Sequence, residues 1–129
     1  EKKVNAMSKR YNIDAQPYPV LTAGQLKGYD LVVCCADNLD IRRTMYNSKV
    51  KWLDLRAQAR NAAMISHLEK PELYNVFTSG PDVSCQGDSW EGEPEGVNFM
   101  QVVIAGYGAQ WIQRWFNGDY VEKHFRING

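Results

Sequence analysis

The residues of this sequence most suggestive of chemistry stand together, directly after an apolar run. Residues 29–36 read Tyr-Asp-Leu-Val-Val-Cys-Cys-Ala, and Asp37, Asn38 and then Arg42 follow them. A carboxylate such as that of Asp37 can hold a magnesium ion, and magnesium completes its octahedron with phosphate oxygens. The alternative is that Asp37 is a solvated helix cap and Arg42 a surface cation. The residues therefore allow either a magnesium–nucleotide site or an ordinary helix start.

A second candidate for chemistry is Cys85, within a loop over residues 79–96 that is rich in Gly, Pro, Ser and acidic residues. A loop thiolate can attack an adenylate and carry the product as a thioester. Against this, the loop contains no Lys or Arg, and negative neighbours raise the pKa of a thiol. Its acidic residues are Asp82, Asp88, Glu91, Glu93 and Glu95. A catalytic thiol and a non-catalytic loop thiol both stay open.

Several other polar residues are expected to be structural. Cys34 and Cys35 lie inside the apolar run, which predicts core packing for both. His67 and His124 have no second metal ligand at a suggestive spacing, so we expect them to be structural or surface residues. The sequence also lacks the paired Cys-x-x-Cys motifs of structural zinc sites, so we expect no zinc.

Two arginines and the tryptophans complete the candidates. Arg56 and Arg60 flank an expected bend at residues 56–61 and are expected to be surface cations, although either can contact a phosphate or a carboxylate. Trp90 lies in the acidic loop and could cover a ligand. The other tryptophans are expected in the core or at an interface: Trp52, Trp111 and Trp115.

The elements that must position Asp37 follow from the local pattern. The continuous apolar run at residues 29–36 predicts a parallel strand buried on both faces. Asp37 or Asn38 can accept hydrogen bonds from the first free amides of a helix over residues 39–49, and Asp40 suits its positive end. Ligands bind beyond the carboxyl ends of parallel strands, which is where Asp37 is expected.

The flanking segments predict further strands and helices. We expect strands at residues 51–55, 62–68 and 120–127, an edge strand at 16–21 that contains two prolines, a turn at 23–28, and a helix at 1–11. The strongest helix prediction covers residues 97–116, which carry a wide apolar face. Gly106 and Gly108 fall within it, and close approach of another backbone would offset their cost. Strands alternating with helices predict a single layered α/β domain over residues 1–129.

Composition sets the broad class of the protein. Fifteen basic residues balance fifteen acidic ones, which gives no overall field to attract nucleic acid or an anionic membrane. Residues 97–116 carry too many polar groups for a membrane span, and no leader pattern predicts a signal peptide. Three cysteines cannot all pair, which favours reduced thiols and a cytoplasmic setting. The chain begins inside a helix-like pattern, so we expect a fragment or one chain of a split fold.

The Asp37-Asn38 pair with Arg42 resembles a motif of the ThiF/MoeB/HesA family and the related ubiquitin-activating enzymes. Residues 51–56 (Lys-Trp-Leu-Asp-Leu-Arg) resemble the next family strand, and residues 96–118 the family's glycine- and alanine-dotted late helix. The resemblance spans most of residues 1–118, of which only Asp-Asn-x-x-x-Arg is specific. It implies the carboxyl-terminal half of a Rossmann-like nucleotide-binding domain, with a partly parallel sheet, antiparallel strands at its carboxyl end and flanking helices.

The resemblance also implies an activity: ATP-dependent adenylation of the C-terminus of a ubiquitin-like or sulfur-carrier protein. Asp37 would hold the magnesium of ATP, Asn38 and Arg42 match the other motif positions, and Cys85 would accept the acyl group. Arg43 is a neighbour that could compete for the role of Arg42. Relatives form dimers, so a homo-oligomer is expected.

The sequence departs from this family in one important respect. The family's glycine-rich phosphate turn lies before the matched segment, and no Gly-x-Gly-x-x-Gly occurs in the chain. Helix-start amides and such a turn supply most phosphate affinity, so these residues alone are expected to bind ATP weakly or not at all. The alternative function is therefore a non-catalytic scaffold half that dimerises and holds a partner protein. A generic Rossmann-like dehydrogenase or methyltransferase explains the alternation of elements but not the motif.

Overall fold

The sheet is the centre of the molecule. The structure, a computed structural model, describes residues 11–15, 20, 22–58, 60–78 and 99–128. They form a mixed α/β fold around an open four-stranded sheet of order β1-β2-β3-β4. The strands are β1 (Val32–Cys34), β2 (Trp52–Gln58), β3 (Asn61–Ser66) and β4 (His124–Asn128). β1 and β2 are parallel, whereas β2–β3 and β3–β4 are antiparallel pairs.

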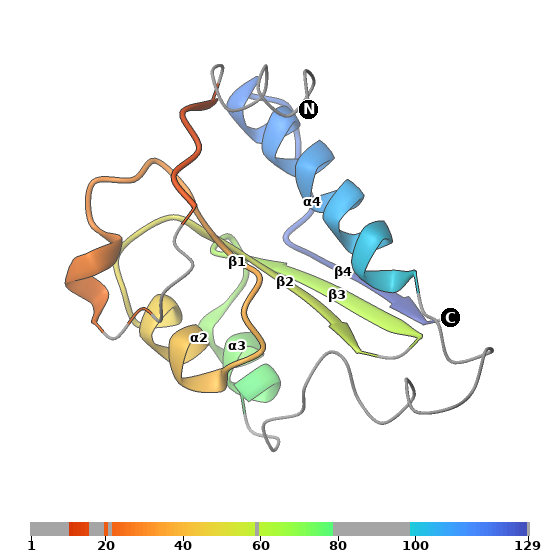
Figure 1. The fold of residues 1–129 in the computed structure, drawn as a ribbon, viewed down its shortest axis with the longest axis horizontal. Coiled ribbons are helices and arrows are strands. Elements are labelled where there is room, and N and C mark those ends of the chain that lie inside the picture. Colours follow the sequence, from red (N-terminus) through yellow and green to blue (C-terminus); the bar gives the residue numbers. More distant parts are fainter. Residues whose placement is uncertain (1–10, 16–19, 21, 59, 79–98, 129) are drawn as a thin grey trace.

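Helices cover both faces of this sheet (Figure 1). Helix α4 (Met100–Phe116) packs on one face, and α2 (Leu39–Tyr46) and α3 (Pro71–Thr78) pack on the other. A short 3-10 helix, η1 (Ala23–Leu26), precedes β1. The result is three layers, as the alternation of strands and helices predicts. Within the described part of the chain, no helix is long and apolar enough to cross a membrane.

Strand β2 separates two hydrophobic cores because successive side chains of a strand point to opposite faces. Leu53, Leu55 and Ala57 point toward α4 and pack in one cluster with Ile104 and Trp111. The alternate residue Trp52 lies in the second cluster, beneath α2 and α3. On that second face the strand also presents Asp54 and Arg56, which hydrogen-bond to side chains of α2. A buried polar site therefore lies on the α2 side of the sheet.

The two mid-helix glycines of α4 have different surroundings. A Cβ at Gly108 would lie 2.6 Å from Cδ1 of Leu55, so this glycine lets α4 approach β2 closely. A Cβ at Gly106 would meet nothing within 4 Å. A close neighbour is thus present at Gly108, but it is the side chain of Leu55 and not the backbone that the sequence predicts. At Gly106 the prediction was wrong.

The segment that leads into the carboxyl-terminal strand is fixed by hydrogen bonds from helix α4 and from the neighbouring strand β3. The indole Nε1 of Trp111 donates to the Glu122 carbonyl at 2.8 Å. The backbone N–H and the hydroxyl of Ser66 both donate to the Lys123 carbonyl, each at 2.8 Å. These bonds bring the chain alongside β3 immediately before β4 begins at His124. The strand is therefore shorter than the residues 120–127 that the alternation predicts.

Several predicted boundaries were wrong. The expected bend over residues 56–61 is much shorter, since β2 continues through Arg56 to Gln58. Helix α2 ends at Tyr46, earlier than predicted, and β1 occupies only the middle of residues 29–36. Helix α3 was not predicted at all. The expected strand at 16–21, most of the helix at 1–11 and the loop at 79–96 lie outside the described residues.

Candidate functional site

Asp37 lies in the short connection that follows the parallel strand β1. The register pairs Cys34, the last residue of β1, with Asp54 of β2. The chain then leaves the sheet through Cys35, Ala36 and Asp37 and enters α2 at Leu39. Asp37 is exposed. The structure thus places this carboxylate in solvent just beyond the carboxyl end of a parallel strand.

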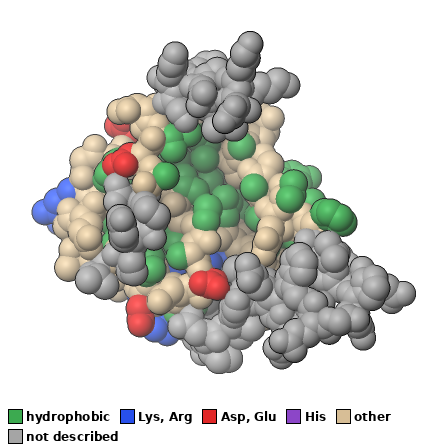
Figure 2. Space-filling view, viewed as in Figure 1, with side chains coloured by type: hydrophobic (Ala, Val, Ile, Leu, Met, Phe, Trp, Pro, Cys, Tyr) green, Lys and Arg blue, Asp and Glu red, His purple; other side chains and the backbone are tan. Residues whose placement is uncertain are grey.

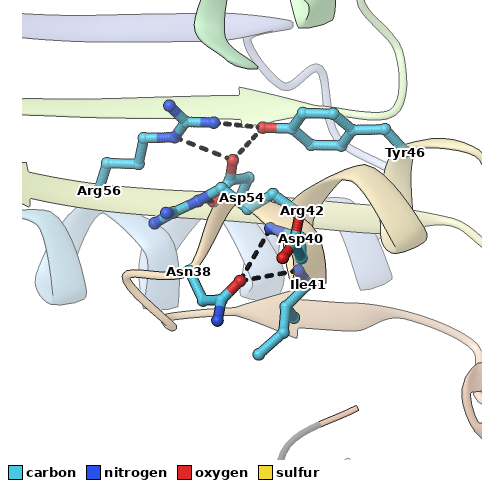
Figure 3. A network of polar contacts seen from close by, with 7 residues as sticks. All are labelled: Asn38, Asp40, Ile41, Arg42, Tyr46, Asp54 and Arg56. Atoms are coloured by element: carbon cyan, nitrogen blue, oxygen red, sulfur yellow. Dashed lines mark hydrogen bonds and ion pairs between the residues drawn. The ribbon is translucent and has the colours of Figure 1, made fainter. Parts of the chain in front are cut away.

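Asn38 caps helix α2. Its side-chain oxygen accepts hydrogen bonds from the backbone N–H of Asp40 at 2.8 Å and of Ile41 at 3.3 Å (Figure 3). These amides lack partners within the first turn of a helix, so the cap satisfies them. The capping role that the sequence predicts for Asp37 or Asn38 is therefore confirmed, and it falls to Asn38.

Arg42 does not lie on the surface but points into the protein. It is 4% exposed, and its Nε donates to the Oδ1 of Asp54 at 3.0 Å. Asp54 itself is 0% exposed, in the middle of β2. The pair forms because α2 crosses over the β1–β2 pair and directs this side chain at the sheet. The interpretation of Arg42 as a surface cation was wrong; the structure does not test its proposed role at a nucleotide site.

Two further residues, Tyr46 of α2 and Arg56 of β2, complete a network around Asp54, as Figure 3 shows. The Nε of Arg56 donates to Oδ2 of Asp54 at 3.1 Å, and the hydroxyl of Tyr46 donates to the same oxygen. A guanidinium nitrogen of Arg56 also donates to the Tyr46 oxygen at 2.7 Å. The buried carboxylate therefore accepts from three side chains on two elements. Arg56 is a half-buried partner of Asp54, so its prediction as a surface cation was wrong.

Burial and the charge of Asp54 shift the pKa values of three groups around this carboxylate. Burial raises the pKa of Tyr46, and the Asp54 carboxylate raises it further, so the phenol keeps the proton that it donates. Burial alone would lower the pKa of Arg42, but the charge of Asp54 and the hydrogen bond to it raise the pKa above its usual value. Burial, followed by the charge of Asp54, raises the pKa of Cys34 to about 11. Cys34 is therefore a thiol and not a nucleophile.

Sequence reasoning missed Asp54 and Tyr46. Asp54 carried a usable signal, because a carboxylate within the apolar stretch Trp-Leu-Asp-Leu must find a partner when the strand is buried. Arg56 lies two residues further and hence on the same face. Tyr46 carried no comparable signal, since a tyrosine at the end of an amphipathic helix is ordinary.

The donor set at Asp37 fits magnesium only together with a nucleotide. Among the described residues, no three His, Cys, Asp or Glu side chains gather into a metal site. Magnesium, however, is commonly held by one or two carboxylates and completes its shell with phosphate oxygens and water. An exposed single carboxylate at the end of a parallel strand is compatible with that arrangement.

The cysteines of the apolar run and the two histidines were predicted to be structural or surface residues. Cys34 is buried but Cys35 is exposed, so the prediction that both pack in the core was wrong for Cys35. His67 donates from Nδ1 to the Trp52 carbonyl at 3.0 Å, and burial lowers its pKa. Nδ1 of the exposed His124 lies 2.6 Å from a carboxylate oxygen of Glu69. Both histidines are thus structural or surface residues, as predicted.

The tryptophans that the structure describes pack as predicted. Trp52 and Trp111 are each 2% exposed, one in each core. Trp115 is partly buried and packs against the core between β2 and α4 that contains Trp111. Cys85 and Trp90 lie outside the described residues.

Comparison with known proteins adds no relative. No protein-family model matches the chain, and a search of curated proteins returns no match.

Proposed function

We propose that this chain is part of an ATP-dependent adenylyltransferase that activates the C-terminus of a ubiquitin-like or sulfur-carrier protein. The observation that carries the proposal is the exposed Asp37 carboxylate just beyond the parallel strand β1. That is where open α/β sheets bind ligands. The motif resemblance of Asp37, Asn38 and Arg42 selects this reaction among those a parallel sheet can host.

The open edge of the sheet supports the related proposal of an incomplete Rossmann-like nucleotide-binding domain. Among the described residues, β1 pairs with β2 alone. Tyr29 is 40% and Val33 is 39% exposed. Figure 2 shows hydrophobic side chains gathered in the middle of the viewed face, where β1 lies in Figure 1. Parallel strands are normally covered on both faces. We infer that the phosphate-binding part of the domain adds to this edge.

In the proposed reaction the residues of this chain have separate tasks. Asp37 would hold the magnesium of Mg·ATP, and a bound magnesium would supply positive charge to the phosphates during attack of the carrier's carboxylate on the α-phosphorus, with pyrophosphate as the leaving group. Asn38 keeps the start of α2 in place next to Asp37 through its cap. Arg42, held by Asp54, supports the loop from inside the protein. A transfer of the acyl group to Cys85 stays a prediction from the sequence.

The test is a comparison of Asp37→Asn with Asp40→Asn in the intact protein. Asp40 is an exposed carboxylate in the first turn of the same helix, which makes it a matched control. We expect Asp37→Asn to lower ATP–pyrophosphate exchange, measured across a panel of ubiquitin-like and sulfur-carrier proteins, by about 100-fold or more. Asp40→Asn should leave exchange within about twofold of the wild type. Equal exchange rates for the two variants would contradict the proposal.

A second candidate function, a non-catalytic half that dimerises, is favoured by the outward face of α4. Phe99 and Val102 are each 71% exposed, and Tyr107 is 50% exposed. Gly106 on the same helix leaves open space where a side chain would stand. From Phe99 to Gln113 the segment carries no charged residue. Because an uncharged apolar face does not repel its own copy, we propose a second copy of this chain as its occupant.

Sedimentation equilibrium tests this second candidate. Val102→Glu should shift the protein toward monomer by placing two like charges at the contact. Lys27→Glu, an exposed substitution outside α4, should leave the association constant unchanged. An interface of standard size would hold two copies together at a protein concentration of about 100 μM. A wild-type protein that is monomeric at that concentration would therefore rule the candidate out.

A further inference from the structure

We propose that Asp54 is a positioning residue for Asp37, and that it acts through Tyr46 and Arg42. This inference rests on the proposed function and deepens it, because it assigns the groups that aim the magnesium-binding carboxylate. The structural basis is that Asp54 lies opposite the last residue before the loop of Asp37, and that its side chain holds the helix that follows this loop.

One end of the loop lies beside Asp54 in the sheet. Asp54 is the register partner of Cys34, the last residue of β1 and the last before the loop. The loop then has only Cys35, Ala36 and Asp37 before the cap residue Asn38. Such a short connection follows the position of its ends closely, because few backbone torsions separate them.

The other end is held by the side chain of Asp54. Its Oδ1 accepts from Nε of Arg42 at 3.0 Å, and its Oδ2 accepts from the hydroxyl of Tyr46. Arg42 lies in the middle of α2 and Tyr46 is its last residue, so two points along the helix are tied to one carboxylate. Together with the Asn38 cap, these bonds fix the position of α2 over the sheet and its rotation about its own axis.

The composition of the network favours a positioning role over a purely stabilising one. A buried ion pair costs so much desolvation that apolar residues of similar volume often stabilise a core as well or better. Directional hydrogen bonds define a unique geometry, which dispersion contacts between apolar side chains do not. A carboxylate that must meet a metal ion needs that geometry, because misplacement of a fraction of an ångström weakens the contact.

Tyr46→Phe is the gentlest perturbation of the network. It removes one hydroxyl and leaves the aromatic ring, whose centroid lies 4.6 Å from that of Trp52. Asp54 keeps its bonds to Arg42 and Arg56. Tyr74→Phe is the matched control. Tyr74 belongs to the same aromatic cluster, but its hydroxyl donates to backbone carbonyls and not to Asp54.

The first measurement is amide hydrogen exchange of residues 35–41 in the intact protein. Tyr46→Phe should speed exchange there by about tenfold or more, because the variant loses the hydroxyl's bond to the Asp54 carboxylate and the bond that it accepts from Arg56. Tyr74→Phe should leave these rates unchanged. Unchanged exchange in Tyr46→Phe would overturn the inference whether or not the protein binds ATP.

The second measurement is the ratio of ATP affinities with and without Mg²⁺, determined by calorimetry. Loss of folded protein changes the fraction that binds but not this ratio. We expect Tyr46→Phe to reduce the ratio about five- to tenfold and to have no further effect in an Asp37→Asn background. Equal effects in both backgrounds would overturn the inference. A ratio that Asp37→Asn leaves unchanged would instead overturn the proposed function.

Discussion

Asp54 is the residue on which the polar contacts between α2 and the sheet converge. It is fully buried and accepts from Arg42, Tyr46 and Arg56. Asp54→Asn would leave the buried guanidinium of Arg42 without its counter-charge. Loss of one partner from a buried ion pair costs about 3–5 kcal/mol. We expect a decrease of that size in the free energy of unfolding, measured by urea denaturation.

An exposed pair on the same helix provides the control. Arg43 donates to Asp40 at 3.1 Å, and their side chains are 48% and 85% exposed. Solvent screens such a pair, so Asp40→Asn should lower the free energy of unfolding by less than about 1 kcal/mol. Similar losses for Asp54→Asn and Asp40→Asn would show that the buried network contributes little.

Among the elements, α4 offers a direct comparison of two glycines two positions apart. Gly108→Ala would place a methyl group 2.6 Å from the buried side chain of Leu55, so it should lower the free energy of unfolding by about 1–3 kcal/mol. Gly106→Ala meets open space and should raise it by up to about 1 kcal/mol, because alanine favours helix. Denaturation of both variants checks the packing of α4 on β2. Equal effects would mean that the helix sits further from the strand.

The turn after β3 gives the fold a pH dependence through His67. Burial lowers the pKa of His67, so the unfolded chain takes up this proton at a higher pH than the folded chain does. The stability from neutral His67 is complete above pH about 6.5 and is lost as the pH falls through the lower folded-state pKa. The free energy of unfolding should therefore fall as the pH drops below about 6.5. His67→Gln should flatten that slope.

The carboxylate of Glu69 affects stability in a more acidic pH range than His67 does. The hydrogen bond from His124 lowers the pKa of Glu69, so the stability it contributes is present above pH about 4.5 and lost below it. Glu69→Gln should alter the profile only in that acidic range. If His67→Gln leaves the slope just below pH about 6.5 unchanged, another group causes it.

At the scale of the whole molecule, the unpaired edge of β1 bears on whether the 129-residue chain can bind ATP by itself. The sequence has no glycine-rich phosphate turn, and β1 pairs with β2 alone among the described residues. We therefore expect about 1 mM Mg·ATP to shift the thermal unfolding midpoint of the 129-residue chain by less than about 1 °C, because stabilisation requires binding to the folded state. A larger, concentration-dependent shift that Asp37→Asn removes would contradict this expectation.

The sequence by itself determined the elements whose causes are local. The apolar run before Asp37 predicted β1, the pair Asp37-Asn38 predicted the start of α2 without deciding which residue caps it, and the apolar face of residues 97–116 predicted α4. Helix α3 was also predictable in principle, because Pro71 at its first position, followed by Glu72, is typical of a helix start. These features depend on neighbours within one or two helical turns. The assignment to a nucleotide-binding family stays a prediction.

Only the tertiary structure decided which side chains meet. Arg42 and Asp54 are twelve residues apart, and nothing local marks them as partners. The parallel register of β1 with β2 and the path of α2 across that pair bring them together. Likewise, Cys34 is buried whereas its neighbour Cys35 is exposed, and the contact with Leu55 distinguishes Gly108 from Gly106. The physical reason is that burial and pairing depend on the layers packed against a residue, which its own sequence neighbours do not specify.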